Sequence, residues 1–447
     1  MSEARILSDQ VPYSRITAER YVSRDYMERE RERLWGKAWL VAGCAQDVAD
    51  PGDFFVFDLE PESILVSRSE AGELRAFFNV CQHRGARLVG SDLGSMEKYT
   101  CPYYGWTYNN DGSLCHVPDK NRFNRGIPEE QLKLPELRVA DWGGMIWVCM
   151  DDQAPSLEEF LGPIIEMIEP FRPHDMRLVE DQTCRLECNW KAVFDNFGEL
   201  YHVEHIHPQH ELIFDCPTST AEHFDYGHTR VLIDGFTVNS RLPIPDEVPP
   251  TQWAQMETLG MDKDDYQGRV LDVRRDIQVK KRELGPALGY NYDLLSDEQL
   301  SDIVQYNVFP NAVLVLQPEE FWILRSRPHA TDPNKCYWDK FALRMLPDVE
   351  LQKGAKVEFP PLQNRANVSF NLDQNSDGTI RPEHDEFDQE AIIAGEKTMT
   401  ITLDQDIHLI RDVQKGMQSR GFREAWLNED ESRVQHYHTW IDRYMED

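Results

Sequence analysis

Residues 81–106 read CQHRGARLVGSDLGSMEKYTCPYYGW, and this stretch decides how the first third of the chain is interpreted. It holds two short loops that begin with cysteine, Cys81-Gln82-His83 and Cys101-Pro102-Tyr103-Tyr104, and a glycine follows each loop closely. The glycines allow the loops to pack tightly, and the proline stiffens the second loop. A single Cys-x-His sequence is often only a buried thiol beside a core histidine. Two matched loops instead favour a metal site between them.

The sequence around these loops has the residue pattern of a small β domain. From about Trp39 to Met150, short β-branched and aromatic runs such as DFFVFDL, SILVSR and GGMIWVCM alternate with turn signals. The turn signals are DPGD at 50–53, EAGE at 70–73 and NNDG at 109–112. This alternation predicts an antiparallel β domain.

The rest of the chain mixes helical and strand-like patterns. Residues 18–36 and the tail 386–446 have helical spacing, whereas 229–240 and 304–345 contain strand-like runs. We therefore predict an α+β protein with three segments. They are an N-terminal helical segment (1–38) that packs on the third segment, the β domain (39–152) and a larger domain with an antiparallel sheet and long helices (153–447).

Composition narrows the classes of function. The chain has 447 residues, of which 40% are hydrophobic, and its formal net charge is −32. Such a charge repels phosphate backbones and anionic membranes, so nucleic acid and membrane are poor partners. No apolar run reaches membrane-spanning length, Met1 to Arg15 is polar, and the nine cysteines form an odd count. These features predict a cytoplasmic protein with reduced thiols.

A second motif lies at residues 188–210, CNWKAVFDNFGELYHVEHIHPQH. Two imidazoles and one carboxylate can bind Fe(II) on one face and leave positions open for dioxygen. On a regular helix, side chains five residues apart point roughly 140° apart, so His202 and His207 share a metal only if the helix ends between them. Pro208 supports such an end, and His205, three residues after His202, is the rival ligand.

Both motifs resemble those of the Rieske non-heme iron oxygenases, in their ring-hydroxylating alpha subunits. The first resembles the signature of the Rieske [2Fe-2S] domain, and the second resembles the mononuclear iron site of the helix-grip catalytic domain. The resemblance implies that Cys81, His83, Cys101 and the position of Tyr104 hold the cluster. It also implies His202 and His207 as iron ligands, in preference to His205.

The third iron ligand comes from the segment TITLDQDIHLIRDVQKGM, which resembles the C-terminal helix of the family. The matching position is Asp406, with Asp404 and Asp412 as competing carboxylates. The family also carries a carboxylate near the first histidine that bridges to a cluster histidine of the next subunit, and the resemblance gives Glu199 this role. Asp195 is a candidate hydrogen-bond partner of an iron-bound imidazole.

Tyr104 departs from the family, which has histidine at this position. It admits three interpretations: an inactivating natural or engineered change, a phenolate ligand, or a residue whose role another side chain takes over. His116 is close in sequence, but nothing else points to it. We favour the first interpretation, with an impaired cluster.

The resemblance implies an oxygenase component that uses dioxygen and electrons from NAD(P)H, delivered through a reductase or ferredoxin, to hydroxylate an aromatic or other small organic substrate. It also implies a homotrimer, with or without a small β subunit. Glu199 in place of the usual aspartate resembles the carnitine, choline and betaine branch, so a quaternary-amine monooxygenase is an alternative. A non-catalytic structural subunit is a third alternative, and Tyr104 is its strongest support.

Overall fold

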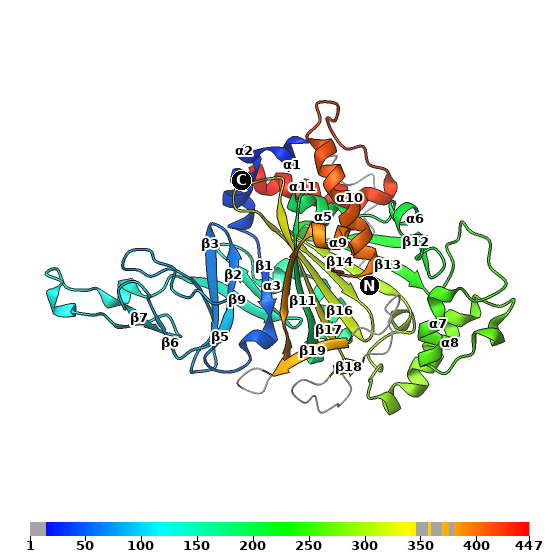
Figure 1. The fold of residues 1–447 in the computed structure, drawn as a ribbon, viewed down its shortest axis with the longest axis horizontal. Helices are drawn as coiled ribbons and strands as arrows, with labels where there is room; N and C mark the ends of the chain where they lie inside the picture. The colour runs from blue at the N-terminus through cyan, green and yellow to red at the C-terminus, as the bar shows by residue number, and fades with distance from the viewer. Residues whose placement is uncertain (1–14, 346–355, 359–368, 375–379, 447) are drawn as a thin grey trace. The chain divides into compact units, whose positions relative to one another are not determined.

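The computed structural model describes residues 15–345, 356–358, 369–374 and 380–446 (Figure 1). The chain forms two compact units. One unit is Glu30–Phe160, and the other joins Met1–Arg29 to Leu161–Asp447. The N-terminal helical segment is therefore divided. Helix α1 and helix α2 up to Arg29 belong to the larger unit, whereas Glu30 and the π-helical turn Arg31–Trp35 belong to the smaller one.

The smaller unit is built on antiparallel strands, as the sequence predicts. Seven strands form a sheet in the order β1-β10-β9-β4-β3-β2-β5, and three more form the small sheet β6-β7-β8. The strands are β1 (Leu40–Cys44), β2 (Asp53–Leu59), β3 (Glu62–Arg68), β4 (Leu74–Phe78), β5 (Leu93–Ser95), β6 (Lys98–Thr100), β7 (Thr107–Asn109), β8 (Leu114–His116), β9 (Glu136–Trp142) and β10 (Met145–Cys149).

The core of the smaller unit contains both loop cysteines. Cys81 follows β4, and Cys101 opens the connection between β6 and β7. The two thiols are 1% and 2% exposed and pack with Trp106, Tyr99 and other apolar side chains in one cluster. The second loop connects β6 to β7, so the small sheet holds this loop in the same core as the first loop.

The larger unit is built on an eight-stranded sheet in the order β12-β13-β14-β15-β16-β17-β11-β21. All neighbours are antiparallel except β11 and β21, which run parallel. Its strands are β11 (Arg177–Leu186), β12 (Phe214–His223), β13 (Thr229–Gly235), β14 (Ile303–Val308), β15 (Ala312–Leu316), β16 (Glu320–Pro328), β17 (Cys336–Arg344) and β21 (His384–Asp388). A smaller sheet joins β18 (Lys356–Glu358), β19 (Ser369–Gln374) and β20 (Ile380–Pro382).

Helices of very different lengths complete the chain. They are α1 (Glu19–Val22), α2 (Arg24–Glu30), α3 (Leu157–Leu161), α4 (Ile164–Ile168), α5 (Trp190–Asn196), α6 (Val203–Ile206), α7 (Pro250–Thr258), α8 (Asp272–Leu284), α9 (Gln389–Ile393), α10 (Ile401–Met417) and α11 (Ser432–Glu446). Helix α5 packs on β16 and β17, and α10 packs against α5 and α9 (Figure 1). Among the described helices, none has the length and apolar character needed to cross a bilayer. The α+β class with long helices on an antiparallel sheet is confirmed.

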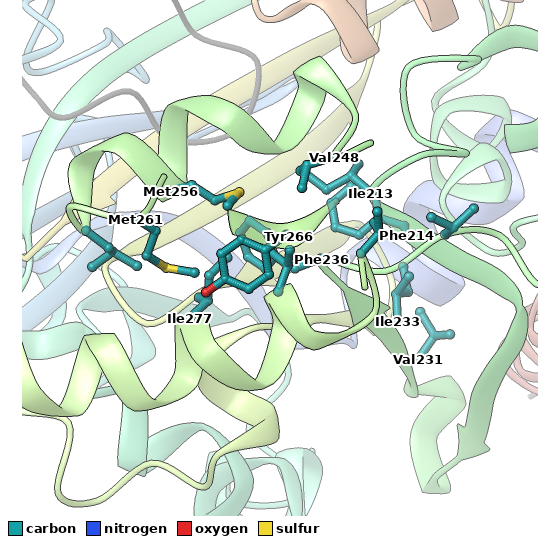
Figure 2. Packing of buried hydrophobic residues seen from close by; sticks show 14 residues of the cluster. Ile213, Phe214, Val231, Ile233, Phe236, Val248, Met256, Met261, Tyr266 and Ile277 are labelled. Atoms are coloured by element: carbon teal, nitrogen blue, oxygen red, sulfur yellow. The ribbon is translucent and has the colours of Figure 1, made fainter. Parts of the chain in front are cut away.

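The chain between β13 and β14 adds a separate layer of apolar packing. Buried side chains of α7 and α8, including Met256 and Ile277, join Phe214 and Ile233 of β12 and β13 in one cluster. Figure 2 shows these side chains meeting between the helices and the strands. This cluster continues the core of the sheet outward, so α7 and α8 support the strands that also line the cavity described below.

Candidate metal centres

His202 and His207 lie at the two ends of a single helical turn. Helix α6 begins after His202, and the carbonyl of His202 accepts a hydrogen bond from the N–H of Ile206 at 3.2 Å. His207 leaves the helical conformation with φ −120° and ψ 59°. Pro208 explains this change, because proline disfavours helical backbone in the residue before it. The helix therefore ends between the two imidazoles.

Asp406 faces the same point from α10. This helix begins at Thr400, whose side chain accepts a hydrogen bond from the N–H of Leu403 and so caps the first turn. Leu403, Ile407 and Ile410 form the buried stripe of α10, and Asp406 lies on that buried side with 4% exposure. A carboxylate is rarely buried without a partner, so the position of Asp406 itself suggests a site.

Three donor atoms converge here. Oδ1 of Asp406 lies 3.1 Å from Nε2 of His207 and 3.8 Å from Nε2 of His202. In the described part of the chain, this is the one group of three such side chains whose donor atoms all lie within 4.8 Å. Metal bonds of about 2.1 Å at right angles separate ligand atoms by roughly 3 Å. Oδ1 is also buried with no hydrogen-bond partner among the described residues, so a small divalent ion fits this group.

The other ring nitrogen of each histidine has a hydrogen-bond acceptor. Nδ1 of His202 donates to Glu199, and Nδ1 of His207 donates to Oε1 of Gln405 at 2.7 Å. Both Nε2 atoms are thereby left as lone-pair donors that face Asp406. Burial lowers the pKa of His202, but the hydrogen bond and the charge of Glu199 outweigh it and raise that pKa.

Glu199 pairs with His202, but the two residues do not lie on one helix. Helix α5 ends at Asn196, and residues 197–202 form turns. Glu199 instead folds back, and its second carboxylate oxygen accepts the backbone N–H of His202 at 3.0 Å. The carboxylate therefore caps the turn before α6 while it orients the imidazole.

Sequence reasoning missed Gln405 and its partner Gln209. Oε1 of Gln405 also accepts a hydrogen bond from Nε2 of Gln209 at 2.7 Å, and the return bond spans 3.3 Å. The amide pair therefore fixes the acceptor that orients His207. The only signal in the sequence was the position of Gln405 directly before Asp406.

Asp195 does not contact either histidine of the triad. Its carboxylate accepts hydrogen bonds from the hydroxyl of Tyr21 at 2.5 Å and from Nε2 of His438 at 3.0 Å. The expectation that Asp195 orients an iron-bound imidazole is therefore wrong. Asp195 instead links α5 to Tyr21 of α1 and to His438 of α11.

The competing ligands lie elsewhere. His205 is exposed, whereas His207 is 1% exposed. Asp404 accepts hydrogen bonds from the hydroxyl of Thr398 and the N–H of Met399, so it stabilises the start of α10. Asp412 is exposed and pairs with a lysine of the next turn. None of the three contributes an atom to the convergent group.

The convergent group lines a cavity of about 1140 Å³, a volume that includes the solvent at its mouth. The wall is mainly apolar and comes from the sheet and α10; it includes Phe214, Ile233, Ile303, Val315 and Leu403. The convergent group and the apolar space thus share one chamber, as a site that brings a metal to a small molecule requires.

His210 adds a polar group to this chamber. Its Nε2 lies 2.9 Å from the hydroxyl of Thr402, and its Nδ1 is buried with no partner among the described residues. Burial and the charges of His207 and His202 lower the pKa of His210 to about 3, so its ring is neutral near pH 7. Because it lines the cavity, His210 is placed to hydrogen-bond a bound molecule, a role that the sequence did not indicate.

The two cysteine loops have the same backbone hydrogen bond and the same backbone conformation at their glycine. The N–H of Gly85 donates to the carbonyl of Cys81, and the N–H of Gly105 donates to the carbonyl of Cys101, each at 3.0 Å. Both glycines have positive φ, 76° and 71°, which side chains rarely adopt. The two loops therefore form equivalent turns.

Three of the four expected cluster ligands fit an iron–sulfur cluster. The thiols of Cys81 and Cys101 are buried, and Nδ1 of His83 is a buried nitrogen with no hydrogen-bond partner among the described residues. The ring of His83 stacks on Trp106 with centroids 4.8 Å apart, which fixes its orientation. Tyr104 does not fit, because its hydroxyl accepts a hydrogen bond from Nη1 of Arg84 at 2.8 Å.

Comparison with protein-family models gives two matches. A model described as "Ring hydroxylating alpha subunit (catalytic domain)" matches residues 173–447, and one described as "Rieske [2Fe-2S] domain" matches residues 38–137. The first match contains the convergent group, and the second contains both cysteine loops.

Curated relatives include both amine and aromatic oxygenases. The glycine betaine monooxygenase oxygenase subunit of Pseudomonas aeruginosa is 31% identical over 189 residues, which cover 42% of this chain and 44% of the relative. The large oxygenase component of the naphthalene 1,2-dioxygenase system, also of Pseudomonas aeruginosa, is 32% identical over 189 residues, 41% of this chain and 42% of the relative. The similarity to these relatives thus spans less than half of their length.

Solved structures match over nearly the whole chain. The quaternary ammonium Rieske monooxygenase CntA, in complex with an inhibitor, gives a TM-score of 0.66 at 18% identity over 98% of this chain and 97% of that one. Naphthalene 1,2-dioxygenase with indole bound gives a TM-score of 0.66 at 17% identity over 99% and 95%. At these identities the two likenesses establish the fold.

Proposed function

The chain belongs to the family of Rieske ring-hydroxylating oxygenase alpha subunits, and from this premise we propose that it is the oxygenase component of a multicomponent enzyme. In this proposal, it hydroxylates a neutral, mainly apolar organic molecule, such as an aromatic compound, with dioxygen. The observation that carries the proposal is the convergence of His202, His207 and Asp406 on one side of a mainly apolar cavity.

We propose these three side chains as the iron ligands. Iron held by two imidazoles and one carboxylate has open positions at which dioxygen is activated. Glu199 and Gln405 orient the two imidazoles through Nδ1, so that Nε2 of each ring points at the metal position. Phe214 and Ile233 belong to the apolar wall that would exclude water, and His210 would offer a neutral hydrogen-bonding group to the substrate.

The charges around the cavity favour a neutral substrate. Glu320 lines the cavity but is already paired with Arg344 through contacts of 2.9 and 3.0 Å. The ring of Trp322 has the ammonium of Lys340 at 4.8 Å from its centroid. A cationic substrate would be favoured by a carboxylate without another partner. Of the carboxylates that line the cavity, Glu199 is bound to His202, Glu320 is bound to Arg344, and Asp406 is a proposed metal ligand.

A quaternary amine is the second candidate substrate. It is favoured by the relatives that are named as glycine betaine and carnitine monooxygenases, and by the glutamate at position 199. The two candidates differ in charge, so the binding of one representative of each class separates them.

The remaining parts of the proposal rest on the family alone. Electrons would come from NAD(P)H through a reductase, with or without a ferredoxin. Three chains would form a ring in the cytoplasm, with or without a small β subunit, and Glu199 would bridge to the neighbouring subunit. A role in the breakdown of aromatic hydrocarbons would follow from an aromatic substrate.

Metal binding tests the proposal first. Anaerobic titration of the full chain with Co(II), read by its visible spectrum, should show one tight site that is lost in Asp406→Ala. Naphthalene should then perturb that spectrum, and glycine betaine should not. Perturbation by glycine betaine alone would move the proposal to the second candidate. A chain that binds no metal would favour a structural subunit. An Asp406→Ala variant that binds metal equally well would remove Asp406 from the proposed ligands.

A further inference from the structure

The phenol of Tyr104 is already engaged on the outer side of its loop. Its hydroxyl accepts a hydrogen bond from Arg84 at 2.8 Å, and the guanidinium carbon of Arg84 lies 5.7 Å from the ring centroid. Tyr104 is 37% exposed, and Arg84 is exposed as well. The oxygen that would have to bind iron is therefore paired with a cation near solvent.

His83, unlike Tyr104, has a buried polar atom that is not engaged by a neighbour among the described residues. Its Nδ1 is buried and has no partner among the described residues, although buried nitrogen atoms are normally hydrogen-bonded. Its ring is fixed by Trp106 on one face, and Tyr104 stands edge-on to it, with ring centroids 4.7 Å apart. The two loops thus bury two thiols and one ring nitrogen. The side chain at the fourth position, Tyr104, contacts His83 only through its ring.

Neighbouring side chains do not replace the missing imidazole. His116, on β8, is exposed. The hydroxyl of Tyr108 is buried, but it lies 3.5 Å from the sulfur of Cys81 and accepts the N–H of Gln82 at 3.0 Å. The hydroxyl of Tyr108 is therefore engaged with the first cysteine loop.

We propose that Tyr104 is not a cluster ligand, and that the iron next to His83 would keep one coordination position that none of the described side chains fills. That position is suited to a small neutral nitrogen base, because an imidazole is what a Rieske iron binds there. The ring of Tyr104 stands edge-on to His83, so its removal should open the position to such a base. The proposal rests on family membership and on the loop geometry, and it does not depend on the substrate or on turnover.

The test compares variants of the full chain after anaerobic reconstitution with Fe(II) and sulfide. Acid-labile sulfide is measured, because the mononuclear site contributes none, together with the electron paramagnetic resonance of the reduced protein. Tyr104→Phe should match the parent chain in both measurements. Tyr104→His should raise sulfide to about two per chain and show a Rieske signal. Tyr104→Ala should show that signal only when free imidazole is added.

The same measurements can overturn the proposal. Loss of sulfide, or loss of a phenolate-to-iron absorption band, in Tyr104→Phe would make the phenolate a ligand. A full Rieske signal in the parent chain would mean that another nitrogen fills the position. No gain in Tyr104→His would show that position 104 is not the defect. Because Tyr104 is partly exposed, these variants should fold, and thermal unfolding of each variant checks that its smaller unit has done so.

Discussion

Replacing Gln405 with leucine should weaken metal binding without unfolding the chain. Leucine removes the oxygen that accepts Nδ1–H of His207 at 2.7 Å and the amide of Gln209 at 2.7 Å. A donor left without its partner in a partly buried place costs about 1–3 kcal/mol. At about 1.4 kcal/mol per tenfold change, this corresponds to roughly a 10–100-fold loss of affinity, the range found for such outer partners of metal ligands.

The assay is an anaerobic Co(II) titration with the visible spectrum as readout, and thermal unfolding without metal as a check on the fold. Gln405→Glu keeps an acceptor for His207, so it should bind metal within a few-fold of the parent chain. His408→Leu is the matched control, because His408 is exposed on the same helix. If Gln405→Leu binds metal as tightly as His408→Leu does, the hydrogen bond to His207 does not prepare the site, and the reasoning fails.

Glu199→Gln keeps an acceptor for His202 but removes the charge; it should retain mononuclear iron, measured by atomic absorption, while product formation falls about 10–100-fold. Loss of the iron would instead make Glu199 a ligand. Stability should also depend on pH through His436, because burial and the charges of His223 and Arg443 lower its pKa to about 4. The unfolded chain binds the proton first as pH falls below about 6.5, so the contribution of His436 to the free energy of unfolding should drop by roughly 3 kcal/mol between pH 6.5 and 4. Urea unfolding of His436→Gln should show a correspondingly smaller drop, and an equal drop would exclude His436 as the cause.

The sequence was sufficient for features that depend on local chemistry. The loops at Cys81 and Cys101 carry their own turn residues, and their glycines do adopt positive φ. The strand-like runs of residues 39–150 form antiparallel sheets because their β-branched and aromatic residues suit a pleated, buried surface. Pro208 signalled the end of α6 because its effect on the preceding residue is local.

The partners of Asp195 could not be predicted from the sequence. The carboxylate was expected near the iron ligands, but it binds Tyr21 and His438. These residues lie 174 and 243 positions away along the chain, so their contacts depend on how α1, α5 and α11 pack. A motif gives the spacing of a side chain along the backbone but not the direction in which it points from its helix.

By itself, the sequence determined the fold class and the family, and it named the residues whose donor atoms converge beside the cavity. Only the tertiary structure decided which acceptor orients each imidazole, how the charges around the cavity are paired, and that the hydroxyl of Tyr104 is bound by Arg84. The physical reason is that turns and strands follow from short-range sterics and from the spacing of apolar residues, and both depend on residues that are close together in the sequence. Hydrogen bonds and ion pairs of buried side chains depend on elements that meet only after the chain has packed.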